Sequence, residues 1–130
     1  MEQAETVLIV DAANVVGSRP DGWWRDRAGA TARLRDRLTG IAAGGLAEMV
    51  PPVRVVLVVE GAARDIPAVP GVEVVAASGS GDDTIVEVVR AHPGRRRVVV
   101  TADRLLCARV AAEDAEVRGP RWLTGATGHD

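Results

Sequence analysis

The sequence predicts an α/β fold: a Rossmann-like, three-layer α/β/α sandwich with a mostly parallel sheet of about five strands. Runs of consecutive β-branched and aliphatic residues recur along the chain, which is typical of strands buried on both faces of a parallel sheet. Segments with a helical spacing of apolar residues lie between these runs, and this alternation favours right-handed crossover connections. The length of 130 residues indicates a single domain over 1–130, with a core over 6–123 and a tail at 124–130.

The strands are predicted from four apolar runs and one weaker segment. The four runs are residues 6–10, 53–59, 72–76 and 97–101. The weaker, fifth strand is expected near 116–118 or at 121–123. Valine dominates the two runs at 53–59 and 97–101, and its branched side chain favours strands over helices.

Three segments between the strands have the spacing of helices. They are residues 28–43, 82–91 and 104–112. In the first, Leu34, Leu38 and Ile41 fall at i, i+4 and i+7, which gives one apolar stripe. Residues 61–71 are expected to form a loop or one short turn, because prolines and glycines interrupt them.

Composition excludes several classes of chemistry. All 16 basic residues are arginine, so mechanisms that need a lysine, such as a P-loop or a Schiff base, are absent. Cys107 is the only cysteine and lies in an apolar helical pattern, so neither an internal disulfide nor a cysteine-based zinc site is expected. No apolar run reaches the length of a membrane span and the first residues are acidic, so a cytoplasmic protein without a membrane partner is expected.

Acidic residues follow the predicted strands at four places. Asp11 follows the first strand, Glu60 the second and Asp103 the fourth, while Asp82 and Asp83 open the helix after a Gly-Ser loop. The carboxyl ends of parallel strands meet at one edge of a sheet, where ligands of such folds bind. We therefore expect these carboxylates to lie near one another.

Carboxylates gathered at one edge need a counter-charge. Two anions ~4 Å apart repel by about 4 kcal/mol at an effective dielectric near 20. Mg²⁺ or Mn²⁺, which prefer oxygen ligands, are the expected cofactors, and such a site suits phosphate chemistry. Each acid taken alone has an alternative role to metal binding, because an aspartate after a strand also serves as a turn or cap residue. Asp82 and Asp83 in particular could cap a helix N-terminus.

Four motifs occur in a familiar order. They are VLIVDAANVVG at 7–17, VVLVVEG at 55–61, SGSGDDTIVEVV at 78–89 and VVVTADRLL at 98–106. Together they resemble the PIN-like nuclease superfamily, and within it the NYN domain of the bacterial YacP-like branch, over residues 6–123. The resemblance implies a Rossmann-like sandwich and metal-dependent cleavage of RNA, or of structured DNA. It also implies in-line attack by a metal-activated water, which leaves a 5′-phosphate.

The resemblance assigns roles to the residues that match its motifs. Asp11 would be a metal ligand, and Asn14 would orient Asp11 or a phosphate. Asp82 and Asp103 would be catalytic metal ligands. The remaining matches are Thr101 beside Asp103, Asp83 as a further ligand, and Glu60 where relatives often carry aspartate. Glu48 is the alternative to Glu60 as the second acid.

Substrate-facing residues are expected in the segment RPDGWWRDR at 19–27. One of Trp23 and Trp24 should pack on the core while the other faces solvent, where it could stack on a base beside Arg25. The alternatives are that both tryptophans cover the open end of the core, or that they form the contact of a homodimer. Arg64 and Arg104 each closely follow an acid and could contact the scissile phosphate.

Two other functions stay open. A nucleotide pyrophosphohydrolase would use the same acids, and a PIN-like module could bind RNA or a protein without cutting. A phosphoaspartyl hydrolase is excluded, because its D-x-D motif would need an aspartate where Ala13 stands.

Overall fold

The computed structural model describes residues 5–19 and 22–126, and it contains a five-stranded sheet in the order β3-β2-β1-β4-β5. All four neighbouring pairs run parallel, so the predicted α/β class with a parallel sheet is confirmed. The strands are β1 (Thr6–Asp11), β2 (Val53–Val59), β3 (Glu73–Ala76), β4 (Arg97–Val100) and β5 (Glu116–Arg118).

The unbroken apolar runs arise because the central strands are buried on both faces. In β1, Leu8 and Val10 belong to one hydrophobic cluster, whereas Val7 and Ile9 belong to a second one. Successive side chains of a strand point to opposite faces, so each cluster lies on one side of the sheet. All four side chains have no exposed surface.

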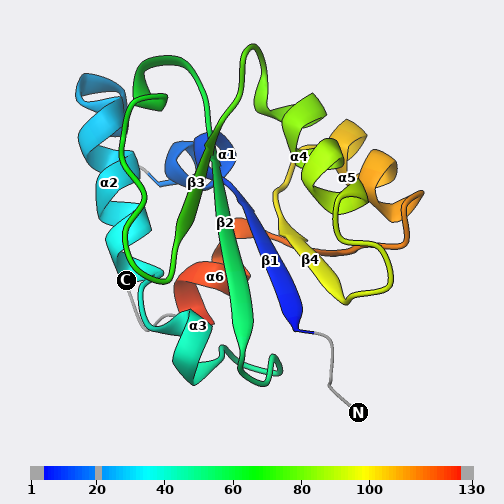
Figure 1. Cartoon of the computed structure of the whole chain (residues 1–130). Helices are drawn as coiled ribbons and strands as arrows, with labels where there is room; N and C mark the ends of the chain where they lie inside the picture. The colour runs from blue at the N-terminus through cyan, green and yellow to red at the C-terminus, as the bar shows by residue number, and fades with distance from the viewer. Residues whose placement is uncertain (1–4, 20–21, 127–130) are drawn as a thin grey trace.

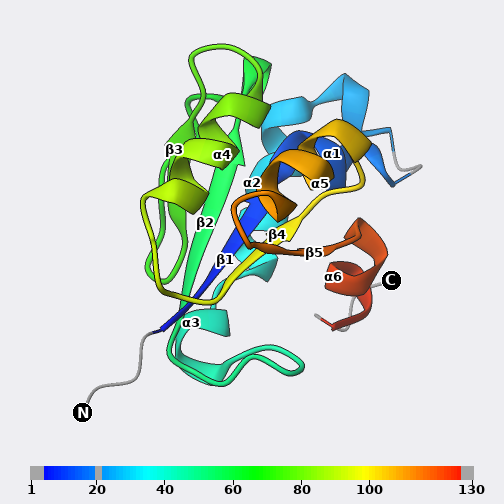
Figure 2. The same cartoon turned by 90° about the vertical axis from the view of Figure 1, so that its right-hand side faces the viewer.

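Helices cover both faces and complete the predicted three layers, as Figures 1 and 2 show. One face packs against α1 (Ala12–Gly17), α2 (Arg27–Arg37), α3 (Ile41–Gly44) and α6 (Pro120–Ala126). The other face packs against α4 (Gly81–Arg90) and α5 (Arg104–Ala111). Two 3-10 turns, η1 (Trp23–Arg25) and η2 (Gly61–Ala63), complete the elements.

The helix predicted over 28–43 is in fact two helices. The first, α2, ends at Arg37 and α3 begins at Ile41. Gly40 between them has φ 92°, a left-handed conformation that ends a helix and that glycine adopts at little cost. Leu34, Leu38 and Ile41 still share one core, so the predicted apolar stripe packs as expected although the helix breaks.

The C-terminal segment confirms one prediction and differs from two others. The fifth strand is Glu116–Arg118, at the first of its two predicted positions, whereas residues 120–126 form α6 rather than a strand at 121–123 or a tail from 124. Pro120 suits the first position of a helix, because its missing N–H has no helical partner there. Leu123 anchors the helix, since it is 2% exposed in the core. The rest of the predicted tail, residues 127–130, lies outside the described residues.

The chain crosses from one face of the sheet to the other at its centre. The connection from β1 to β2 passes over the α2 face, whereas β4 connects to β5 through α5 on the opposite face. β1 and β4 are hydrogen-bonded neighbours, so their carboxyl ends flank a topological switch point. Ligand sites of open α/β sheets lie in the crevice at such a point. In the described part of the chain, no helix has the length and apolar character of a membrane span.

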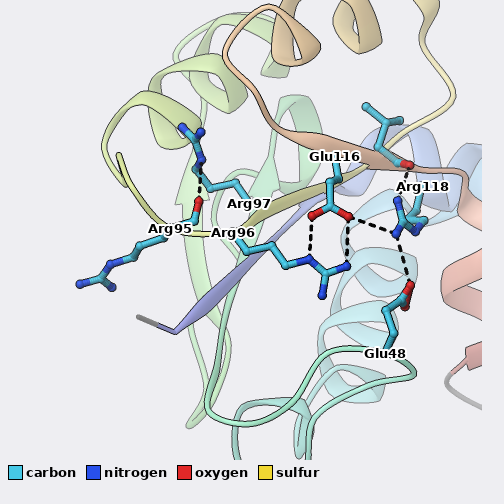
Figure 3. A network of polar contacts seen from close by, with 7 residues as sticks. Glu48, Arg95, Arg96, Arg97, Glu116 and Arg118 are labelled. Atoms are coloured by element: carbon cyan, nitrogen blue, oxygen red, sulfur yellow. Dashed lines mark hydrogen bonds and ion pairs between the residues drawn. The ribbon is translucent and has the colours of Figure 1, made fainter. Parts of the chain in front are cut away.

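Arg97 at the start of β4 ties together the ends of two helices. Its guanidinium donates to the carbonyl oxygens of Val89 at 2.9 Å and Glu113 at 2.8 Å, near the ends of α4 and α5. Figure 3 shows its third bond, to the carbonyl oxygen of Arg95. The side chain of Arg95 itself points to the surface, where it pairs with Glu5.

We predict that Arg97→Lys lowers the free energy of unfolding by about 1–3 kcal/mol, because an ammonium cannot reach both helix ends with the fork of a guanidinium. Arg95→Lys is the matched control and should change it by no more than about 0.5 kcal/mol, since its ion pair is exposed. Urea unfolding of both variants measures the difference. Equal losses would show that Arg97 does not tie the helices.

Candidate functional site

Asp11 stands at the carboxyl end of the central strand and is buried, with 6% of its surface exposed. Its Oδ2 accepts a hydrogen bond from the hydroxyl of Thr101, 2.9 Å away at the end of β4. Its Oδ1 accepts from the backbone N–H of Asn14 at 3.4 Å, which caps the short helix α1. The strand-end aspartate thus links β1 to β4 at the switch point.

The loop after β4 is held against α1 by further hydrogen bonds. The side-chain oxygen of Asn14 accepts from the backbone N–H of Ala102 at 2.9 Å. The hydroxyl oxygen of Thr101 accepts from the backbone N–H of Asp103 at 3.2 Å. Asp103 in turn caps α5, because its Oδ1 accepts from the N–H of Leu106 at 3.0 Å. These bonds fix Asp103 relative to Asp11.

Glu60 reaches from the end of β2 to the first turn of α4. Its Oε2 accepts from the backbone N–H of Gly81 at 2.7 Å, and Ser80 at the N-cap makes no such side-chain bond. A Cβ at position 81 would lie 2.6 Å from the same oxygen, so glycine is what permits this approach. Sequence reasoning missed the role of Gly81. The only sign of it in the sequence was the pair of glycines in the SGSG motif.

Four carboxylates share one electrostatic field at this edge. The pKa of Asp11 is raised, first by burial and then by the charges of Asp82 and Glu60, while the hydrogen bonds from Thr101 and Asn14 act in the opposite direction. The pKa of Asp82 is also raised, by burial and then by Asp103 and Glu60. We call Asp11, Glu60, Asp82 and Asp103 the acid group.

The acid group offers carboxylate oxygens, which are the ligands that hard cations such as Mg²⁺ prefer. These oxygens do not by themselves complete the coordination of an ion. Over residues 5–19 and 22–126, no three His, Cys, Asp or Glu side chains stand where they could jointly hold a metal ion. Mg²⁺ commonly keeps several waters and needs only one or two carboxylates besides substrate phosphates. The acid group fits a cation of that kind better than one enclosed by protein.

Two acids considered in the sequence lie outside the acid group. Asp83 follows Asp82 directly, but its Oδ1 lies 2.9 Å from a guanidinium nitrogen of Arg109, and its side chain is 77% exposed. Glu48 joins the ion-pair network of Figure 3, in which Arg118 Nη2 lies 3.2 Å from Glu48 Oε2. Its own backbone N–H and Arg118 lower the pKa of Glu48. Between the two proposed second acids, the geometry favours Glu60.

The two tryptophans divide as the sequence predicted. Trp23 packs against the core, whereas Trp24 is 57% exposed and meets Trp23 edge to face at 6.1 Å. The guanidinium carbon of Arg25 lies 5.8 Å from the ring centre of Trp24. Arg64, just after η2, and Arg104, the first residue of α5, are exposed. Contact of these side chains with a substrate stays a prediction.

A small pocket of about 120 Å³ adjoins the acid group on the α2 side of the sheet. Its walls come from α1, η1, α2 and η2. The lining residues are Ala12, Ala13, Val16, Trp23, Arg27, Thr31, Glu60, Gly61 and Ala63. Glu60 belongs to both the pocket and the acid group. Sequence reasoning placed Arg27 beside a tryptophan in the segment 19–27, but it did not single out Thr31, which carries no recognisable motif.

We predict a coupling between Glu60 and Gly81. Glu60→Ala should lower the free energy of unfolding by about 1 kcal/mol, because the first turn of α4 loses its cap. In a Gly81→Ala background the same change should cost nearly nothing, since the added methyl has already displaced the carboxylate. Chemical unfolding of the four proteins of this double-mutant cycle measures the coupling. Additive effects would contradict it.

The charge of Asp11 should destabilise the metal-free fold at neutral pH. The pKa of Asp11 is raised above the ordinary 3.8. Its carboxyl group therefore contributes most to the free energy of unfolding below pH 3.8, and this contribution is lost as the pH rises through the raised pKa. Asp11→Asn should therefore gain stability relative to wild type as the pH rises from about 4 through the raised pKa of Asp11. Urea unfolding in EDTA measures this, and a difference that stays constant with pH would contradict the raised pKa.

The comparisons with known proteins rest on structure. No protein-family model matches the sequence, and no curated protein matches it. The crystal structure of Rae1 (YacP) from Bacillus subtilis is similar, with a TM-score of 0.74 and 18% identity, over 94% of this chain and 73% of that one. A mutant of Rae1 gives a TM-score of 0.73 at the same identity, over 94% and 74%.

This likeness confirms the resemblance that the four motifs predicted, at the level of the fold. At 18% identity it shows the architecture and not the activity. The chain therefore has the fold of Rae1 (YacP).

Proposed function

We propose that this protein is a metal-dependent endoribonuclease that hydrolyses phosphodiester bonds at the acid group. The observation that carries the proposal is the position of Asp11, buried at the switch point of the sheet, where the charges of Asp82 and Glu60 act on it and Asp103 acts on Asp82. A fold shared with Rae1 supports it. RNA is the proposed partner in preference to structured DNA.

Mg²⁺ or Mn²⁺ is the proposed cofactor, held by Asp11 and Asp82, and we propose that Asp103 and Glu60 act on it through bound water. When bound, such a cation stabilises charge on phosphoryl oxygens and makes water more acidic. Within the described chain none of the four acids forms a salt bridge with an arginine. Burial is the main cause of the raised pKa values of Asp11 and Asp82, and the neighbouring carboxylates add to it, so a bound cation would offset both effects.

The chain's own residues position this chemistry and the substrate. Thr101 and Asn14 each donate one hydrogen bond to Asp11 and so hold its carboxylate in one orientation. The exposed guanidinium groups of Arg104 and Arg64 lie beside acids and can bind phosphates of the strand. Trp24, exposed beside Arg25, offers a face on which a base can stack.

The proposal separates the two adjacent aspartates at the start of α4. Asp82→Asn should lower the cleavage rate at least about 100-fold, because it removes several kcal/mol of electrostatic stabilisation at the metal. Asp83→Asn is the matched control and should stay within a few-fold of wild type, since Asp83 pairs with Arg109 instead. The measurement is cleavage of labelled single-stranded and hairpin RNA with Mg²⁺ or Mn²⁺, and EDTA should abolish it.

Other outcomes would point elsewhere. Equal losses in the two variants would contradict the proposed acid group. Metal binding with release of pyrophosphate from nucleotides, and no cleavage of RNA or DNA, would indicate a nucleotide pyrophosphohydrolase. RNA binding that survives Asp11→Asn, without metal binding or cleavage, would indicate a binding module.

A further inference from the structure

The pocket beside the acid group has the volume of a single ring. It measures about 120 Å³, and an apolar cavity of roughly 150 Å³ is known to accommodate one benzene molecule. Its inner wall is aliphatic, formed by buried residues of α1 and η2 such as Ala12, Val16 and Ala63. This volume is closer to that of a six-membered ring than to that of the fused rings of a purine. We call it the Trp23 pocket.

Trp23 and Arg27 give the Trp23 pocket a flat wall. The guanidinium carbon of Arg27 lies 5.1 Å from the ring centre of Trp23, so the two groups stack on each other. Trp23 is fixed from behind by the core cluster, and Asp26 fixes the start of α2 by accepting a hydrogen bond from the N–H of Gly29 at 2.9 Å. Indole and guanidinium planes are the surfaces on which proteins stack unpaired RNA bases.

Polar atoms at the pocket are suited to a ring that carries hydrogen-bond donors. Glu60 contributes a carboxylate, of which Oε2 already accepts from Gly81. Thr31 contributes a buried hydroxyl that donates to the carbonyl oxygen of Arg27, so its oxygen keeps its capacity to accept. Both uracil and cytosine present N–H groups on their edges to such acceptors.

The position of the pocket relates it to the cleavage site. Glu60 lies in the wall of the Trp23 pocket and also in the acid group, so a base in the pocket belongs to a nucleotide beside the acids. We propose that the Trp23 pocket binds one pyrimidine base of the substrate strand and so selects the bond that is cut. This inference rests on the proposed nuclease function for its role in cleavage, but not for the binding itself.

Two exposed alanines provide a matched test. Ala13 lines the pocket from α1, whereas Ala62 in η2 is equally exposed but does not line it. Ala13→Leu should fill the pocket without disturbing the core, and Ala62→Leu adds the same side chain outside it. Affinities for equal-length oligouridylate and oligoadenylate are measured in EDTA at low ionic strength, where cleavage cannot occur.

Wild type and Ala62→Leu should bind oligouridylate more tightly than oligoadenylate. Ala13→Leu should weaken oligouridylate binding at least about fivefold, the effect of losing one stacked base, and should remove the preference. Cleavage of a random-sequence RNA pool should show a pyrimidine at one fixed position beside the cut, and Ala13→Leu should lose this bias.

The two proposals can fail separately. Cleavage without a pyrimidine bias at any position, or equal behaviour of the two leucine variants, would overturn the pocket and leave the nuclease intact. The protein could instead prefer oligouridylate, lose this preference in Ala13→Leu, and cleave no RNA. That result would support the proposed base-binding pocket and contradict the proposed nuclease function. Thermal unfolding of both variants shows that each is folded.

Discussion

The site depends on one hydrogen bond, between the hydroxyl of Thr101 and the carboxylate of Asp11, which joins the ends of β4 and β1. Both side chains are buried, so the carboxylate would bear an uncompensated desolvation cost without this donor. The bond also fixes the loop after β4, because the same hydroxyl accepts from Asp103. An interaction between residues 90 positions apart therefore sets where two catalytic candidates lie.

Parallel topology explains why acids far apart in the sequence meet. Each crossover returns the chain to the same end of the sheet, so every strand delivers its last side chain to one edge. The connections leave β1 and β4 toward opposite faces, with α1 on one face and α5 on the other, and ligand sites of open α/β sheets lie at such a point. The fold thus provides both the proximity of the acids and access to them.

Sequence patterns predicted the elements whose causes are local. Valine-rich runs predicted the positions of the strands. An acid directly after such a run, such as Asp11 or Glu60, predicted the carboxyl edge of the sheet. Features that depend on tertiary partners could not be read in this way. The motif resemblance ranked Asp82 above Asp83, but the ion pair of Asp83 with Arg109 depends on the packing of α5, and that of Glu48 depends on Arg118.

The distribution of arginine gives the strongest physical argument for a cation. Many arginines neutralise acids away from the crevice, including Arg96 with Glu116 and Arg54 with Glu73. No salt bridge of this kind reaches the acid group within the described residues, although burial, and to a lesser degree the neighbouring carboxylates, raise the pKa of Asp11 and Asp82. A chain that pairs its charges elsewhere keeps a group of acids without salt bridges at the carboxyl edge of its sheet, at a cost in stability. Binding a cation there would recover that cost, which couples the stability of the fold to the chemistry proposed for it.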